Sequence, residues 1–171
     1  MKTFISRGFM AAVAVLSGCA SPGPGVVLDP VGPPPLASAS VSPNGVLIVF
    51  SAFEQSADFN SQLYRRHYTD YRIRSADGKP LQTVRNDGGA LAEGPKRVQL
   101  PVGTYRVVAR ANGYGEVTVP VLIRADQVTT VHLEGSSSWP NRKQLAGSNP
   151  VRLPDGEIAG WRASKDGSSD P

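Results

Sequence analysis

The sequence is poor in the residues that most often bind metals or carry out chemistry. It contains one cysteine, Cys19, and two histidines, His67 and His132, in 171 residues. A single cysteine cannot form an intramolecular disulfide or supply a zinc knuckle. The histidines lie far apart and no spacing supplies further ligands, so we expect no metal site and no cofactor. His132 falls on the polar phase of a predicted strand and is expected to be exposed to solvent.

Catalytic motifs are also missing. The chain has no G-x-S-x-G nucleophile elbow, no Walker-type phosphate loop and no H-E-x-x-H zinc motif. Glu54, Asp58 and Asp70 lie near one another in sequence, but nothing fixes the separation that paired carboxylates need for glycoside hydrolysis. We therefore expect a protein that is not an enzyme, and an enzyme of unrecognised type is the weakest alternative.

The chain has no large excess of charge of one sign. Its 18 basic and 14 acidic residues give a formal net charge of +4. Lys2 and Arg7 lie in the N-terminal segment considered next, and without that segment 16 basic residues face 14 acidic ones. The arginines are scattered and lack the aromatic interleaving of a nucleic-acid-binding motif. We expect no nucleic-acid partner, and a solvated sheet face accounts for the arginines.

The N-terminus has the three parts of a secretory signal peptide. Lys2 and Arg7 give it a positive start, Gly8–Leu16 is a nine-residue apolar stretch, and small residues follow. A membrane-spanning helix needs roughly 20 apolar residues, so this stretch is too short to serve as an anchor by itself. These features predict an exported protein with a signal peptide over residues 1–18.

The run Leu16-Ser17-Gly18-Cys19 resembles the bacterial lipobox, in which an apolar residue and two small residues precede a cysteine. The resemblance implies cleavage between Gly18 and Cys19 and a lipid on Cys19, whose acyl chains, palmitate among them, hold the protein on a membrane. Ala20 and Ser21 follow the cysteine, which in a Gram-negative envelope favours the periplasmic face of the outer membrane. The alternative is an ordinary signal peptide beside an incidental cysteine.

Composition divides the remaining chain into three parts. Residues 19–44 hold seven prolines and are predicted to be an extended linker. Residues 45–134 form the predicted folded module. Residues 135–171 are polar and predicted to be a flexible tail, although a small hairpin around Asp155-Gly156 is an alternative.

The module shows the alternation of short β-strands and no long helical period. Val46–Phe50 reads as a buried strand, and Tyr71–Arg74 and Leu81–Val84 as a hairpin across the turn at residues 76–79. Residues 98–100, 105–110, 117–123 and 131–133 follow with a period of two. The pattern predicts a small antiparallel β-sandwich. Pro120 suggests an edge strand or a bulge, and residues 56–67 suggest one or two helical turns or a loop.

The stretch from Val98 to Leu133 resembles carboxypeptidase-regulatory-like modules, including the PEGA type. The resemblance lies in Leu100-Pro101-x-Gly103-Thr104-Tyr105, in Gly113-Tyr114, and in a final x-Thr-x-Val-x-Leu strand that ends at Leu133. It implies a prealbumin-like β-sandwich. A fold of this kind does not specify a function.

Aromatic residues and arginines gather in one irregular segment, where Tyr64, Arg65, Arg66 and Tyr68 are the candidate binding surface. Stacking rings beside guanidinium donors suit a carbohydrate or peptide. Packing of most of these rings into the core is the competing interpretation. The favoured hypothesis is a membrane-anchored module that binds an envelope protein or glycan or fills a structural role. A second hypothesis is an accessory subunit of an envelope complex, which exposed apolar positions such as Val108 and Leu122 would support.

Overall fold

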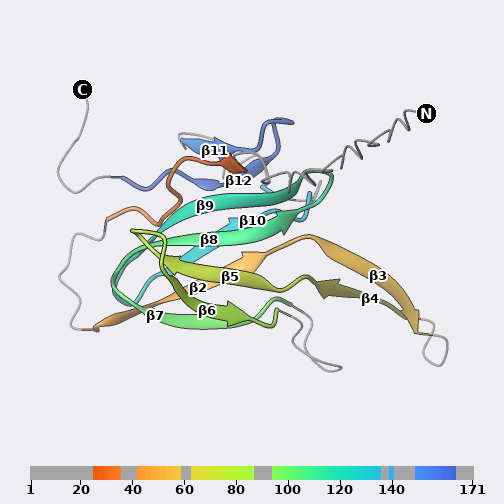
Figure 1. Ribbon diagram of the computed structural model, residues 1–171, viewed down its shortest axis with the longest axis horizontal. Helices are drawn as coiled ribbons and strands as arrows, with labels where there is room; N and C mark the ends of the chain where they lie inside the picture. The colour runs from red at the N-terminus through yellow and green to blue at the C-terminus, as the bar shows by residue number, and fades with distance from the viewer. Residues whose placement is uncertain are drawn as a thin grey trace, which may run out of the picture.

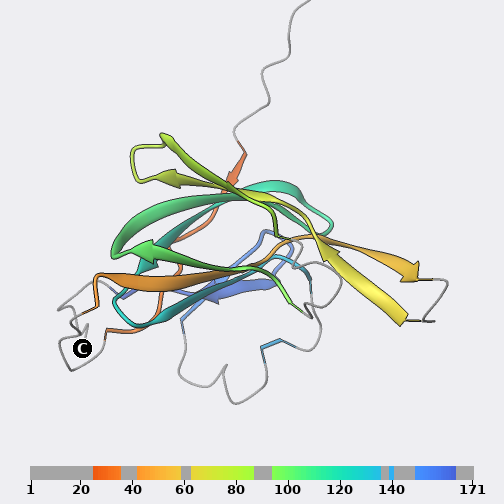
Figure 2. The same cartoon turned by 90° about the horizontal axis from the view of Figure 1, so that it is seen from below.

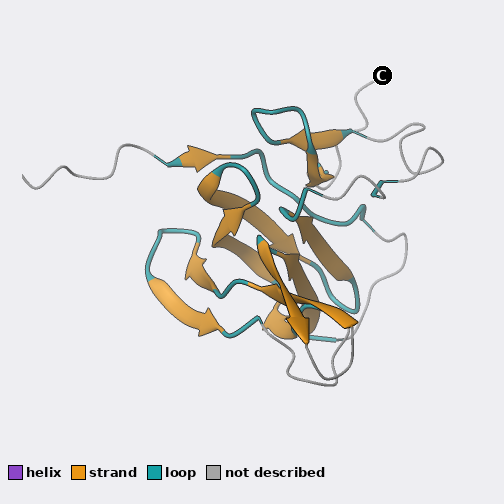
Figure 3. Ribbon diagram, turned by 90° about the vertical axis from the view of Figure 1, so that its right-hand side faces the viewer, coloured by secondary structure: helices purple, strands orange, loops and turns teal. Residues whose placement is uncertain are grey.

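The described part of the chain is built from strands and loops. A computed structural model describes residues 25–35, 42–58, 63–86, 94–135, 139–140 and 149–164, and no helix occurs among them (Figures 1 and 3). Accordingly, these residues include no helix long and apolar enough to cross a membrane. The strands are β1 (Val26–Val27), β2 (Asn44–Phe50), β3 (Phe53–Asp58), β4 (Leu63–Tyr68), β5 (Tyr71–Ser75), β6 (Pro80–Val84), β7 (Arg97–Pro101), β8 (Gly103–Ala111), β9 (Gly115–Ile123), β10 (Val128–His132), β11 (Pro150–Arg152) and β12 (Ile158–Trp161). The predicted all-β class is confirmed.

Two sheets pack face to face as a small β-sandwich (Figure 2). One sheet has five strands in the order β1-β9-β8-β5-β6, and the other has three in the order β10-β2-β7. The inward-facing residues of these strands are fully buried: Leu47, Val49, Ile73, Val107 and Val119 are each 0 % exposed. Burying an apolar side chain of this size stabilises the folded state by roughly 1.5–3 kcal/mol. The inward faces of the two sheets therefore stabilise the packing of one layer on the other. The predicted β5–β6 hairpin is also present.

The alternation predicted a purely antiparallel sandwich, but two of the strand pairs are parallel. β10 runs parallel to β2, and β1 runs parallel to β9. The chain leaves β9 through a short turn at Arg124–Gln127 and crosses into the other sheet, where β10 lies along the edge of β2. The crossing brings backbone very close to Gly45, where a Cβ atom would lie 2.1 Å from the carbonyl oxygen of Arg124. Only glycine fits at this position.

Residues 25–35 of the predicted linker are part of the fold. β1 pairs with Val117 and Thr118 of β9, and Val31 then bridges both Val121 and Arg162. Val31 is 2 % exposed and belongs to the core. The predicted boundary at residue 45 is therefore wrong, because apolar residues within the proline-rich segment complete the edge of the larger sheet.

This edge also explains Pro120. β9 is not an edge strand, contrary to the prediction, because β1 lies beside it. Pro120 sits between the two places where the N-terminal segment pairs with β9, and its carbonyl accepts a hydrogen bond from the Val31 amide (2.9 Å). A proline, which has no N–H to donate, is tolerated at such an interruption.

The predicted flexible tail likewise contributes to the core. β11 and β12 form the hairpin around Asp155-Gly156 that was the alternative to disorder. Val151, Leu153 and Ala159 are 1 %, 3 % and 0 % exposed. The prediction of disorder is wrong for residues 149–164, because burial of a few apolar side chains outweighs the polar composition around them.

The stretch predicted to be helical turns or a loop is a β-hairpin. β3 and β4 pair in register from Phe53 opposite Tyr68 to Asp58 opposite Leu63. The hairpin extends away from the sandwich at one end of the molecule (Figure 1). The four-residue spacing of Phe59 and Leu63 suggested a helix, but Phe59 lies outside the described residues.

Candidate ligand-binding site

At the end of β10 lies a buried histidine–glutamate pair that the sequence analysis did not predict. His132 is 9 % exposed and Glu134 is 4 % exposed. The Nδ1 atom of His132 lies 2.8 Å from Oε1 of Glu134. This contact fixes the orientation of the imidazole ring. The prediction that His132 is exposed is wrong.

Aromatic rings cover both faces of His132. Phe50, its cross-strand partner at the end of β2, stacks on one face with ring centroids 4.6 Å apart. Trp139 stacks on the other face at 3.5 Å and an interplanar angle of 14°. Trp161 of β12 then contacts Trp139 at 5.5 Å in a tilted arrangement. Phe50, His132 and Trp139 therefore form a stack of three rings, and Trp139 is at the end of the stack opposite Phe50.

Two hollows flank Trp139. The first, of about 260 Å³, is lined by His132, Glu134, Gly135, Trp139, Pro140, Arg152, Gly156, Glu157 and Ile158. The second, of about 240 Å³, is lined by Val31, Gly32, Pro33, Pro34, Val128, Thr130, His132, Trp139 and Trp161. Pro33 and Pro34 of the N-terminal segment already line the second hollow and cover part of it. The first hollow is therefore the better candidate for a ligand.

The first hollow combines one aromatic surface with polar groups at its border. Arg152 and Glu157 come from the β11–β12 hairpin, and Arg152 donates to the carbonyl of Gly156 (2.7 Å), which holds its guanidinium in place. Asn112 donates from its side-chain amide to the carbonyl of Glu134 (2.6 Å), which fixes the loop after β10. Such an arrangement suits a ligand that has an apolar face and hydroxyl or amide groups at its edge.

Most of the predicted binding surface lies outside the side chains that the structure describes. Tyr64, Arg65 and Arg66 belong to β4, and their side chains lie outside the described residues. Tyr68 is 8 % exposed and packs edge-to-face on Phe50 at 5.8 Å. Tyr68 is therefore a packing residue at the base of the β3–β4 hairpin and not part of an exposed surface. Gly18 and Cys19 also lie outside the described residues.

The remaining candidates do not converge. His67 is on β4 opposite Glu54 of β3, so it lies in a strand and not in the solvated loop that was expected. Asp70 accepts a hydrogen bond from the backbone amide of Asn86 (3.2 Å). Within the ranges that the structure describes, no group of three His, Cys, Asp or Glu side chains has the geometry to hold a metal ion.

Sequence signals for the actual site were present but scattered. Trp139 and Trp161 are the only tryptophans in the chain, and both lie in the segment predicted to be a flexible tail. Their partner His132 lies before that segment, so only the fold brings the three rings together. Comparisons with protein-family models, with curated protein sequences and with solved structures found no match to this chain.

Proposed function

We propose that this chain is a lipid-anchored envelope protein whose β-sandwich binds a glycan beside Trp139. In this proposal, acyl chains on Cys19 hold the protein on the periplasmic face of an outer membrane. The lipobox-like run before Cys19 supports the anchor, since it directly follows the apolar part of the signal and contains the chain's only cysteine.

One observation carries the binding role: the Trp139 ring rests on a rigid support at the border of an open hollow. His132 is held beneath it by Glu134 and by Phe50. A sugar ring stacks its C–H face on an indole, while its hydroxyls accept hydrogen bonds from a guanidinium and donate them to a carboxylate. Arg152 and Glu157 supply both groups at this hollow.

The size of the hollow also favours part of a larger glycan. Pockets that enclose a drug-sized molecule have volumes of roughly 300–1,000 Å³, whereas this one has about 260 Å³. One ring of a chain of sugars fits such a space, and the neighbouring rings extend over the surface.

The hypothesis of an accessory subunit has less support. It relied on Val108 and Leu122 as exposed apolar positions in the module. Val108 is 8 % exposed and Leu122 is half-buried. The large apolar side chains that are exposed among the described residues, such as Val27, Leu81 and Val102, lie on different elements and define no single partner surface.

The binding role is tested with the full chain and soluble peptidoglycan fragments as the probe, by isothermal titration calorimetry. We expect Trp139→Ala to weaken binding at least about tenfold, which corresponds to the loss of one stacked ring. Tyr114→Ala is the matched control, because Tyr114 is an exposed aromatic residue on the β8–β9 turn. Equal binding by Trp139→Ala and the wild type, or no binding by either, would refute a glycan site here.

The anchor is tested by intact-mass spectrometry of the protein extracted from membranes. We expect a chain that starts at Cys19 and carries added acyl mass, and we expect Cys19→Ala to lack that mass. A wild-type chain without acyl mass would make the protein a freely secreted β-module and would leave the glycan experiment unaffected.

A further inference from the structure

A further hollow, away from the two beside Trp139, lies on the outer face of the five-stranded sheet and has a different chemistry. It has a volume of about 460 Å³ and is lined by Gly25, Arg74, Gly78, Arg106, Val108, Glu116 and Thr118. Ile73, Val107 and Val119 point from the same strands into the core. Their neighbours in sequence therefore point away from the core, which places this hollow on the opposite face from the three-stranded sheet.

Two arginines stand side by side in this hollow without a carboxylate partner. Arg74 of β5 and Arg106 of β8 are direct cross-strand neighbours. Like charges in that relation destabilise a sheet. Among the described residues, neither guanidinium forms an ion pair, and Nε of Arg74 is buried without a hydrogen-bond partner. Arg74 reaches only the carbonyl of Gly78, at 3.4 Å.

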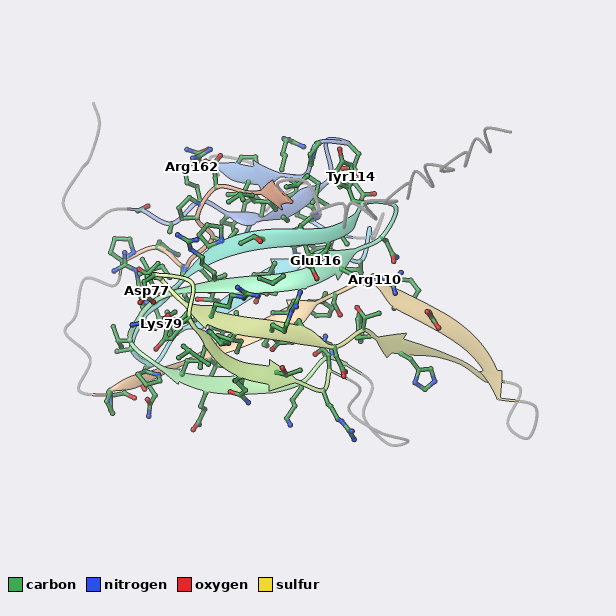
Figure 4. All side chains as sticks on the ribbon, viewed as in Figure 1. Asp77, Lys79, Arg110, Tyr114, Glu116 and Arg162 are labelled. Carbon is green, nitrogen blue, oxygen red and sulfur yellow. The ribbon has the colours of Figure 1, made fainter. Side chains whose placement is uncertain are left out.

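The acidic side chains nearby are already neutralised. Glu116, which borders the hollow, forms an ion pair with Arg72 and lies opposite Arg110 in the β8–β9 register. Figure 4 labels Glu116 and Arg110 on these neighbouring strands. Asp77, at the β5–β6 turn, pairs with Lys79 at 3.2 Å and accepts a hydrogen bond from Ser75. The positive charge of Arg74 and Arg106 is therefore left uncompensated within the hollow.

The hollow also has room for a compact anion. Gly25 and Gly78 border it without side chains, and no atom lies within 4 Å of a Cβ built at Gly78. Val108, buried by its neighbours, gives an apolar floor that strengthens the field of the two arginines. Paired guanidinium forks match the oxygens of a phosphate group.

We propose that this hollow binds a phosphate group between Arg74 and Arg106. A membrane phospholipid is one source, because Gly25 is only six residues from Cys19, and six residues span at most about 20 Å. Free phosphate is the other source. The phospholipid source rests on the proposed anchor at Cys19, whereas the anion site itself does not.

The test uses the full chain in neutral detergent and follows the Nε–Hε resonances of its arginines by NMR. Two probes are titrated separately: inorganic phosphate and soluble dihexanoyl phosphatidylglycerol, whose phosphodiester represents the lipid headgroup. The variants are Arg106→Gln, which changes an exposed side chain, and the double variant Arg74→Gln/Arg106→Gln. The matched control, Lys96→Gln/Arg97→Gln, removes two charges from exposed positions at β7 in the other sheet.

We expect a probe to shift the resonances of Arg74 and Arg106, and the double variant to bind it at least about tenfold more weakly. The control variant should bind it as the wild type does. Tighter binding of the phosphodiester assigns the site to a lipid headgroup, and tighter binding of inorganic phosphate assigns it to free phosphate. The proposal fails if neither probe shifts these resonances, or if Arg106→Gln binds both probes as the wild type does. An absence of acyl mass on Cys19 would remove the proposed anchor and leave the inorganic phosphate result intact.

Discussion

Asn86 is a polar residue that links distant parts of the core. Its side-chain amide donates to the carbonyl of Val49 and to Oγ of Ser51, both at 2.9 Å. Its side-chain oxygen accepts from the backbone amide of Lys96 at 3.1 Å. Asn86 and Ser51 are each 0 % exposed. A buried polar group with its hydrogen bonds made is tolerated in a core, whereas its removal leaves the partners unpaired.

Asn86→Ala should therefore lower the free energy of unfolding by about 2–4 kcal/mol, because three hydrogen bonds are lost and buried partners stay unsatisfied. Urea denaturation followed by circular dichroism measures the change. Thr83→Ala, at an exposed position of β6, is the control and should change stability by less than about 0.5 kcal/mol. Similar stabilities for the two variants would show that the Asn86 network contributes little.

Tyr71 presents the opposite case of a buried polar atom without a partner. It is 1 % exposed, and its hydroxyl has no hydrogen-bond partner among the described residues. Burial raises the pKa of its hydroxyl well above the ordinary value, because the phenolate would lose its hydration. Tyr71→Phe should leave stability at neutral pH unchanged or raise it by up to about 1 kcal/mol.

The same residue predicts an alkaline dependence of stability. Above a pH of about 10 the unfolded tyrosine loses its proton while the folded one keeps it. The unfolded state then binds fewer protons, so the free energy of unfolding falls as the pH rises. Urea denaturation between pH 9 and about 11.5 should give a shallower fall for Tyr71→Phe than for the wild type. Tyr114→Phe, an exposed control, should keep the wild-type slope. An unchanged slope in Tyr71→Phe would contradict this role.

At the scale of elements, the sequence predicted those strands that are long enough to show alternation. β8 and β9 each have nine residues, and the period of two at residues 105–110 and 117–123 predicted both strands. Two- to four-residue strands such as β1, β11 and β12 have no visible period. Their strand character depends on pairing with a preformed partner, which composition does not reveal.

The site escaped prediction for a related reason. His132 has the phase of an outward-facing residue in β10, and it is indeed on the face away from the larger sheet. It is buried because Trp139, from beyond the strand, covers it. The periodicity of a strand shows which side chains share a face. It does not show whether a later segment of the chain packs on that face.

Val31 tests whether the proline-rich segment is an element of the fold. Its side chain is 2 % exposed and approaches β12 so closely that a Cβ at Gly160 would lie 2.5 Å from its Cγ1. Val31→Ala should lower the free energy of unfolding by about 1–2.5 kcal/mol, through lost burial and the space it leaves. Val27→Ala, at a position 67 % exposed, is the control and should have little effect in the same urea titration. If Val31→Ala left the free energy of unfolding unchanged, the segment would be a linker that contributes nothing to the packing of the fold.

At the scale of the whole molecule, the docking of this segment would shorten the distance between the module and the proposed anchor at Cys19. A linker reaching from Cys19 to Gly45 would span up to about 90 Å if fully extended. Because residues 26–31 pair with the sandwich, the six residues from Cys19 to Gly25 span at most about 20 Å. The hollow at Arg74 and Arg106 includes Gly25 in its lining, so in the proposed anchored state these two arginines would lie on the side of the module next to Cys19.

Energy transfer in vesicles measures this distance directly. A fluorophore on Val27→Cys, an exposed position beside Gly25, should lie within roughly 30 Å of the acceptor-labelled headgroups, since the reach to Gly25 is about 20 Å. Inserting 15 Gly/Ser residues after Ser21 adds a coil of about 20 Å and should lower the transfer efficiency. Weak transfer in the wild type that the insertion leaves unchanged would place the module far from the membrane. Residues 25–35 would then have to detach from β9 when the protein is anchored. In that case Val31→Ala would not change the free energy of unfolding of the anchored protein.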